Sequence, residues 1–439
     1  MTRRTPLRPA LVALIALSGL VSPLPAQESG RSLHEIAVAV AEAERACRAD
    51  DQRLWGLSLC GPLLFADTAG DRLIASRDVP EAALERTPEG LYVAPLPDDL
   101  PVANTAIDWA DVEWAMVVLP LPDDPTERRG LLIHESFHRI QDDLGLTATG
   151  RAMDHLSAED GRVWLRLELR ALGRALAADS VEELEALKDA LAFRARRQAL
   201  APGAREAETA LELQEGLAAY TGAVLAVASR EEAETRVVEL LDEFDDKDSY
   251  ARSFAYATGP ALGLLADRYA PGWRETIGET RDLAGVLARE IDVAEIPEAE
   301  IMARARTYGL EEIAAEEADR RREAEERRAD YRRRLVEDPV LVLPLQEIQK
   351  TFNPNAVIPL GEHGTVYPTL TLRDRWGTLI VESGGALITA DFTRATAPRA
   401  PGSACAPTGP GWTLELAEGW SLLPGERPND CTVAEPPEP

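Results

Sequence analysis

Two histidines four positions apart restrict the fold of the segment that contains them. His134 and His138 are two of only 5 histidines in 439 residues, and Glu135 directly follows the first of them. Residues four apart lie one turn apart on the same face of an α-helix, so both imidazoles can reach one ion if the segment is helical. The spacing therefore predicts a helix with two potential metal ligands on one face.

Signals on both sides of the histidine pair predict the same helix. Asp124 can cap its start, Pro125 suits its first position, and Glu127 stands where a capping box has its acid. Gly145 is a typical helix stop. We therefore expect the helix to run from the Asp124 cap to about Asp143.

The rest of the chain alternates between β-like and helical composition. Short apolar runs separated by Gly, Asp and Pro predict strands between residues 54 and 121 and again after Pro339. Between them, Leu, Ala, Arg and Glu recur at helical spacing, and residues 206–229 predict one long helix. We expect an α+β protein made of a signal peptide (1–26), an N-terminal helix with a small antiparallel sheet (27–122), a mainly helical core (123–310), a charged connector helix (311–338) and a separate C-terminal β domain (339–439).

The N-terminus has the composition of an export signal. Arg3, Arg4 and Arg8 precede an apolar run over residues 10–21, and Ala26 offers a small residue for cleavage. The run is shorter than the roughly 20 apolar residues that a transmembrane helix needs. We therefore expect a periplasmic or secreted protein that does not insert into a membrane after the signal has been removed.

The 4 cysteines are expected to pair in such an oxidising compartment. Four cysteines allow three connectivities, and proximity in the sequence favours Cys47–Cys60 and Cys405–Cys431. Four unpaired buried thiols are the alternative.

Net charge limits the class of partner. The chain has 47 Lys+Arg against 76 Asp+Glu and a formal net charge of −29. Nucleic acid and anionic membrane surfaces would repel such a chain. We therefore expect neither as its main partner.

The chemistry expected at the histidine pair is that of one zinc ion. Zinc binds two neutral imidazoles and one carboxylate and leaves a position for water, whose pKa the ion lowers. Glu135 lies beside the histidine face, where its carboxylate can accept a proton from that water.

The third ligand has three candidates. Glu215 is favoured, because its helix is otherwise apolar and a buried carboxylate is costly without a partner. Gly216 would let that helix approach the histidine helix closely. Glu159 and Glu212 are the rivals. Glu212 could instead accept a hydrogen bond from an imidazole N–H, or it could be a solvated helical acid.

These residues carry a resemblance to a known family. The motif His134-Glu-Ser-Phe-His138, followed by Glu215-Gly-Leu-Ala-Ala-Tyr220, resembles the gluzincin metallopeptidases, the thermolysin- and aminopeptidase-type group. The resemblance implies a zincin-like catalytic core in which both histidines and Glu215 hold zinc and Glu135 is the catalytic glutamate. It also implies a peptide or protein substrate.

The likeness covers residues 113–143 and 206–228. It implies that the predicted strand 113–119 forms the cleft edge with which an extended peptide pairs. The chain departs from the family pattern at Gln214, which replaces the usual Asn, and in the long stretch between the two motifs.

Tyr256 is the candidate for a further catalytic role. Peptidases of this kind often add a side chain that stabilises the charged tetrahedral intermediate. A tyrosine packed in the helical core is the alternative. His155, by contrast, is expected to be a surface residue.

The sequence supports three functions. The first is an exported zinc metallopeptidase with Glu135 as general base, and the intact motif favours it. The second is a non-catalytic binding or assembly protein of the cell envelope with a structural zinc site. The third is a zinc hydrolase of a non-peptide amide or ester.

Overall fold

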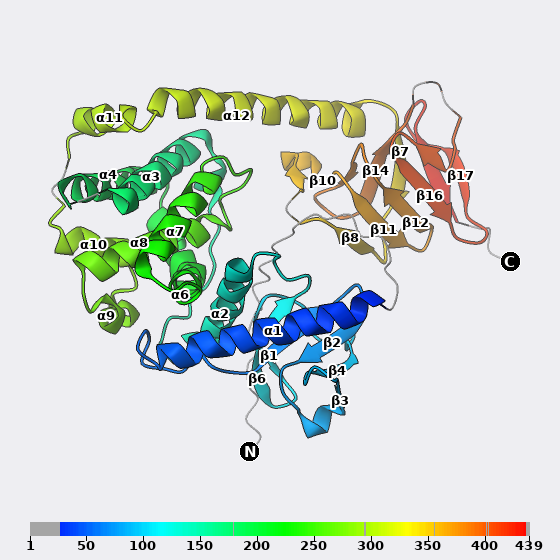
Figure 1. Ribbon diagram of the computed structural model, residues 1–439. Helices are drawn as coiled ribbons and strands as arrows, with labels where there is room; N and C mark the ends of the chain where they lie inside the picture. Colours follow the sequence, from blue (N-terminus) through cyan, green and yellow to red (C-terminus); the bar gives the residue numbers. More distant parts are fainter. Residues whose placement is uncertain are drawn as a thin grey trace, which may run out of the picture. The chain divides into compact units, whose positions relative to one another are not determined.

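The computed structural model describes residues 27–178, 180–293, 296–354, 356–400, 402 and 404–435 (Figure 1). It confirms the expected α+β class, because helices and sheets occupy largely separate stretches of the chain. The chain divides into two compact units, residues 1–317 and 318–439. The predicted signal peptide lies outside the described residues. Within the described part of the chain, no helix combines the length and the hydropathy that crossing a bilayer requires.

The first unit begins with a helix and a six-stranded sheet. The helix is α1 (Gln27–Asp50), and the strand order in the sheet is β3-β4-β2-β1-β6-β5. The strands are β1 (Leu63–Asp67), β2 (Arg72–Ala75), β3 (Glu85–Arg86), β4 (Tyr92–Pro95), β5 (Thr105–Trp109) and β6 (Val112–Val118).

The expected antiparallel sheet needs one correction. Strands β1 and β6 run parallel, with Leu63 opposite Ala115. The other neighbouring strands of this sheet pair antiparallel. Strands β2 to β5 lie between β1 and β6 in the chain, so no tight turn forces an antiparallel pairing on these two.

Strand β6 also lies inside the sheet. It pairs with β1 on one side and with β5 on the other, so β5 is the outer strand. The expectation that residues 113–119 form a free cleft edge is therefore wrong. Neighbour choice in a sheet depends on long-range packing, which the strand's own sequence does not report.

The helix α2 (Pro125–Gln141) packs on one face of this sheet. Its residue Leu132 lies in one core with Ala115 and Val117 of β6, whereas Trp114 and Met116 face the opposite core. The sheet thus supports the helix that carries both histidines.

The start of α2 follows the predicted signals. The Asp124 side chain accepts hydrogen bonds from the backbone N–H groups of Thr126 and Glu127, at 2.9 and 2.8 Å. After the helix ends, Gly145 has a φ of +69°. This left-handed conformation is the one for which glycine is suited.

The remainder of the first unit is a helical bundle around one hydrophobic core. The predicted helix over residues 206–229 is interrupted by a π-helical turn, Glu212–Gly216, which we call the π-turn. The helices are α3 (Glu159–Ala177), α4 (Ser180–Gln198), α5 (Ala204–Leu211), α6 (Leu217–Leu225), α7 (Arg230–Phe244), α8 (Phe254–Tyr269), α9 (Trp273–Thr280), α10 (Leu283–Glu290), α11 (Glu298–Arg306) and the start of α12 (Leu310–Arg332), which continues into the second unit.

The second unit consists of two sheets that share a hydrophobic core. One sheet has the order β17-β18-β7-β14-β13-β10-β9 and the other the order β15-β16-β12-β11-β8. Their shared core contains Trp376 and Trp412. The strands are β7 (Val340–Pro344), β8 (Gln349–Phe352), β9 (Ile358–Pro359), β10 (Thr365–Tyr367), β11 (Leu370–Asp374), β12 (Gly377–Val381), β13 (Ala386–Ile388), β14 (Arg394–Pro398), β15 (Thr408–Gly409), β16 (Trp412–Leu416), β17 (Ser421–Pro424) and β18 (Cys431–Ala434).

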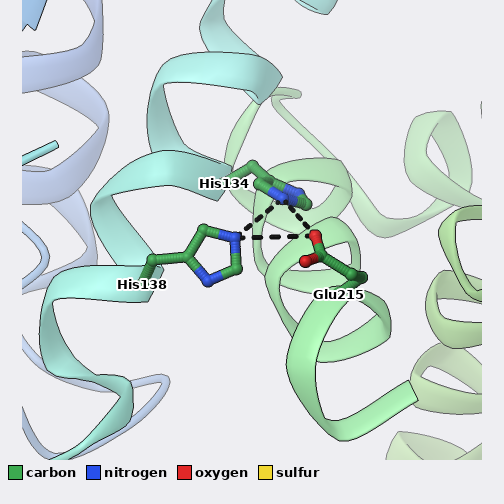
Figure 2. A group of neighbouring side chains, drawn as sticks. All are labelled: His134, His138 and Glu215. Carbon is green, nitrogen blue, oxygen red and sulfur yellow. Dashed lines mark hydrogen bonds and ion pairs between the residues drawn. The ribbon is translucent and has the colours of Figure 1, made fainter. Parts of the chain in front are cut away.

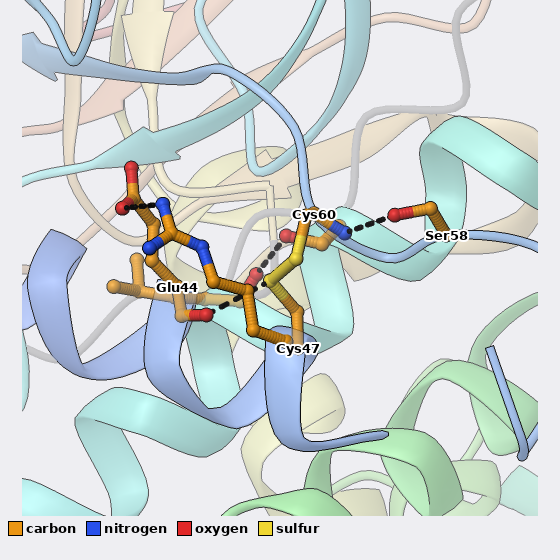
Figure 3. Close-up of a disulfide and its surroundings, with 7 residues drawn as sticks. Glu44, Cys47, Ser58 and Cys60 are labelled. Carbon is orange, nitrogen blue, oxygen red and sulfur yellow. Dashed lines mark hydrogen bonds and ion pairs between the residues drawn. A yellow bond between two sulfur atoms is a disulfide. The ribbon is translucent and has the colours of Figure 1, made fainter. Parts of the chain in front are cut away.

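Each unit contains one of the two predicted disulfides. Cys47 near the end of α1 is bonded to Cys60, which precedes β1 (Figure 3). Cys405 is bonded to Cys431 at the start of β18. The alternative of four free thiols is therefore wrong.

Candidate metal centre

Three of the predicted ligand side chains meet at one point in the first unit. Figure 2 shows His134 and His138 projecting from α2 toward Glu215 of the π-turn. The two histidine Nε2 atoms are 3.2 Å apart, and Glu215 Oε2 lies 3.3 Å from that of His134 and 3.6 Å from that of His138. All three side chains are buried, with at most 9% of their surface exposed. We call this group the HHE cluster.

The spacing in the HHE cluster fits one metal ion. Ligand atoms that bond an ion at about 2.0–2.1 Å in tetrahedral directions lie about 3.3 Å from one another. The observed separations of 3.2, 3.3 and 3.6 Å are close to this value. Imidazole nitrogen and carboxylate oxygen are also donors that divalent transition metals accept. Among the described residues, the HHE cluster is the group of His, Cys, Asp and Glu side chains whose ligand atoms all lie within 4.8 Å of one another.

The electrostatics of the HHE cluster favour positive charge at its centre. Burial alone would lower the pKa of His138, but the close Glu215 carboxylate and the charge of Glu135 raise it to about 9. Burial alone would raise the pKa of Glu215, but its close contacts with both histidines hold it well below its ordinary value. A cation between these groups would therefore meet an ionised carboxylate.

The π-turn determines where Glu215 points. The backbone N–H of Leu217 bonds to the carbonyl of Glu212, five residues earlier, in place of the usual four. Such a turn adds one residue to the helix and shifts the face on which side chains lie. Turns of this kind are frequent at functional sites.

Two pairs of glycines bring the surrounding helices close together. A Cβ on Gly222 of α6 would lie 2.6 Å from the carbonyl oxygen of Gly130 on α2. A Cβ on Gly259 of α8 would lie 2.3 Å from the Cα of Gly216. Gly216 was expected to allow a close approach to the histidine helix α2. This expectation is wrong, because Gly216 lies against α8, whereas Gly222 of α6 lies against α2.

Glu135 lies beside the HHE cluster in a buried position. Its carboxylate oxygens approach the Nε2 atoms of His134 and His138 to 4.0 Å each. The residue is 2% exposed, and its Oε2 has no hydrogen-bond partner among the described residues. Burial raises the pKa of Glu135 in spite of the two neighbouring histidines. Such a carboxyl group is suited to accept and return a proton.

Tyr256 of α8 reaches the HHE cluster from a third element. Its hydroxyl donates a hydrogen bond to Glu215 Oε2 at 2.7 Å. Its ring stacks on the His134 ring, with 5.5 Å between centroids and 9° between planes. Burial, with the charge of Glu215, raises the pKa of Tyr256, so its hydroxyl remains a donor. Tyr256 therefore contacts two candidate ligands and does more than fill the core.

Glu212 does not accept a hydrogen bond from an imidazole N–H, as the sequence had suggested. Its carboxylate binds Arg194 at 2.8 and 2.5 Å and accepts a hydrogen bond from the Thr258 hydroxyl at 2.6 Å. The carboxylate makes no hydrogen bond to either imidazole, and Glu212 is 7% exposed, so it is neither an acceptor for a histidine N–H nor a solvated acid. Glu159, the other rival ligand, is outside the HHE cluster.

A buried series of ion pairs explains the position of Glu212. Arg194 also binds Glu168, which in turn pairs with Arg197, and Arg197 pairs with Glu208. His155 completes the series, with its Nε2 atom 2.7 Å from Glu208 Oε1. The expectation of a surface histidine is wrong, because the His155 side chain is 6% exposed. Its acidic partner lies 53 positions later in the chain.

Gln141 is a site residue that sequence reasoning missed. Its side-chain oxygen lies 2.9 Å from Nδ1 of His138, and the residue is 3% exposed. Its position could have predicted this contact, because Gln141 follows His138 by three residues on the same helix, and side chains at that spacing are neighbours.

Comparisons of this chain with protein-family models, with curated proteins and with solved structures find no match.

Proposed function

We propose that this protein is an exported zinc-dependent peptidase. The observation that carries the proposal is the convergence of His134, His138 and Glu215, with the Glu135 carboxylate 4.0 Å from each histidine Nε2. Two imidazoles and one carboxylate are a donor set typical of catalytic zinc. When bound, zinc supplies Lewis-acid chemistry, because it lowers the pKa of water and polarises a carbonyl group.

Glu135 acts as the general base and then as the general acid. It accepts a proton from the water that attacks the peptide carbonyl, and it passes that proton to the amine nitrogen as the C–N bond breaks. Its unpartnered Oε2 and its raised pKa support this role. A carboxyl group in an apolar site can exchange a proton closer to neutral pH than a solvated one.

Tyr256 and the packed surroundings keep the other groups in place. The Tyr256 hydroxyl holds Glu215 through a 2.7 Å hydrogen bond, and its ring supports His134. Export is supported by the two disulfides, which persist mainly in oxidising compartments.

The substitution Glu135→Gln tests the mechanism. The amide cannot accept the proton, so we expect hydrolysis of a mixed peptide library to fall by about 10²–10⁴-fold. Zinc content should stay stoichiometric, because the three ligand side chains are unchanged. The matched control is Glu127→Gln, the same change at an exposed position of the same helix. Unchanged turnover in Glu135→Gln would refute the role of Glu135.

The zinc-loaded wild-type protein separates the three candidate functions. It is incubated with the peptide library and with panels of simple amides and esters. Peptide cleavage supports the proposal, and cleavage of only the small amides or esters favours the non-peptide hydrolase. Stoichiometric zinc without any cleavage favours the binding protein. Purified protein that takes up no zinc contradicts all three.

A further inference from the structure

One buried amide connects the two elements that carry the HHE cluster. Gln141, the last residue of α2, has its Oε1 atom 2.9 Å from Nδ1 of His138. Its Nε2 atom donates to the backbone carbonyls of Leu213 and Gln214, at 2.8 and 3.1 Å. Both carbonyls belong to the π-turn, and Glu215 is the next residue. The amide therefore contacts a candidate ligand on one helix and the backbone beside a candidate ligand on another.

The hydrogen-bond partners of the Gln141 side-chain amide allow only one assignment of its oxygen and nitrogen. Carbonyl oxygens only accept hydrogen bonds, so the NH₂ group of Gln141 must face Leu213 and Gln214. Its oxygen then faces His138, and this oxygen can only accept. A further donor, the side-chain amide of Gln214, reaches the same oxygen at 3.3 Å. Nδ1 of His138 must therefore carry the hydrogen in this contact.

The position of that hydrogen decides how His138 can act. A histidine binds a metal ion in its neutral form, which has one N–H and one free lone pair. With the hydrogen on Nδ1, the lone pair is on Nε2, which is the atom that faces Glu215 and His134. Partners that fix the tautomer of a ligating histidine commonly change metal affinity or activity by about 10–100-fold when they are removed.

We infer that Gln141 is a positioning residue that fixes the Nδ1–H tautomer of His138 and fastens the π-turn to α2. The inference rests on the proposed function only in taking zinc as the ion. It assigns Gln141 no contact with the substrate. Its effect passes through His138 and through the backbone that carries Glu215.

Two variants and one control test this role. Gln141→Met removes both the acceptor and the donor while keeping a side chain of similar length. Gln141→Glu keeps an acceptor for His138 but places a second oxygen against the two carbonyls. The control is Gln198→Met, which removes an amide that donates to Glu208 at 2.8 Å elsewhere in the same unit. For each protein, the zinc dissociation constant is measured by competition with a chelator. Proton NMR of the zinc-loaded protein follows the exchange of the His138 Nδ1 hydrogen with solvent.

The inference makes distinct expectations for each protein. In Gln141→Met the zinc dissociation constant rises by about 10–100-fold and the His138 Nδ1 hydrogen exchanges rapidly. In Gln141→Glu that hydrogen stays protected, and in Gln198→Met both readouts match the wild type. Wild-type zinc affinity and a protected hydrogen in Gln141→Met would overturn the inference, as would an unprotected hydrogen in the wild type.

These readouts separate the inference from the proposed function. A wild-type protein that binds zinc and cleaves nothing refutes the peptidase, while the zinc affinities still decide the role of Gln141. A wild-type protein that hydrolyses peptides, together with unchanged zinc affinity and a protected His138 hydrogen in Gln141→Met, refutes the positioning role alone.

Discussion

One oxygen of the Glu215 carboxylate contacts three side chains at the candidate centre. Glu215 Oε2 faces the Nε2 atoms of His134 and His138 and accepts a hydrogen bond from the Tyr256 hydroxyl. Hydrogen bonds to charged groups contribute about 1.5–3 kcal/mol. The hydroxyl of Tyr256 should therefore contribute measurably to how well Glu215 holds a metal ion.

The substitution Tyr256→Phe tests this contribution. It removes the hydroxyl but keeps the ring that stacks on His134. We expect the zinc dissociation constant to rise by about 10–100-fold, because the buried carboxylate loses a donor. The constant is measured by competition with a chelator.

The matched control is Tyr250→Phe, at another buried tyrosine. Its hydroxyl donates to the backbone carbonyls of Phe244 and Asp245. This variant should lose stability and keep its zinc affinity. If Tyr256→Phe binds zinc as tightly as the wild type but turns over more slowly, the hydroxyl acts on the substrate and not on Glu215.

At the scale of elements, the close approach of α8 to the π-turn positions the third ligand. Gly259 and Gly216 face each other, and a Cβ at Gly259 would overlap with the backbone of Gly216. Backbone cannot move aside as a side chain can, so the two elements must separate to admit a methyl group. Glu215 directly precedes Gly216 and would move with it.

The substitution Gly259→Ala should therefore weaken both stability and zinc binding. We expect a loss of about 1–3 kcal/mol in the free energy of unfolding, as for other overpacked cores, together with a higher zinc dissociation constant. Urea denaturation followed by circular dichroism measures the first quantity and chelator competition the second.

Gly173→Ala is the control for that experiment. Gly173 is also a buried glycine inside a helix, but a Cβ there would only touch Leu241 at 3.9 Å. Alanine in a helix interior is favoured over glycine by about 0.5–1 kcal/mol, so this variant should be as stable as the wild type or more stable. Equal behaviour of the two alanine variants would contradict the packing argument.

At the scale of the whole molecule, the candidate centre and the C-terminal sheets belong to different units. The boundary at residues 317 and 318 falls within α12. The early part of this helix joins the first unit through Glu317, which pairs with Arg162 and Arg166 in a buried position. The HHE cluster and the Cys405–Cys431 disulfide thus lie on opposite sides of the boundary.

The double substitution Cys405→Ala with Cys431→Ala should affect one unit alone. The disulfide closes a loop with a sequence separation of 26 residues. In the chain-entropy model its loss lowers the free energy of unfolding by about 3–4 kcal/mol. We expect calorimetry to show a lower unfolding temperature for the second unit. The zinc dissociation constant should be unchanged.

The corresponding pair Cys47→Ala with Cys60→Ala is the reciprocal control. It should lower the stability of the first unit and leave the transition of the second unit in place. If loss of Cys405–Cys431 weakens zinc binding, the two units are coupled in a way that the division into residues 1–317 and 318–439 does not capture.

Sequence alone determined the features that depend on near neighbours. The cap at Asp124, the helix through His134 and His138, and the two disulfides all involve residues close together in the chain. Helix capping and i, i+4 geometry are local, so short patterns report them reliably. The choice of Glu215 over Glu159 also followed from sequence, because an acid on an apolar helix needs a partner.

Which distant groups meet depends on long-range packing and could not be predicted from the sequence. The parallel pairing of β1 with β6, the partner of Gly216, the turn of Glu212 toward Arg194 and the contact of Gln141 with the π-turn all join segments far apart in the chain. Each of these residues has several possible partners of suitable chemistry. Burial selects among them, because a polar group inside the core is stable only where the packing brings a complementary group within hydrogen-bond distance.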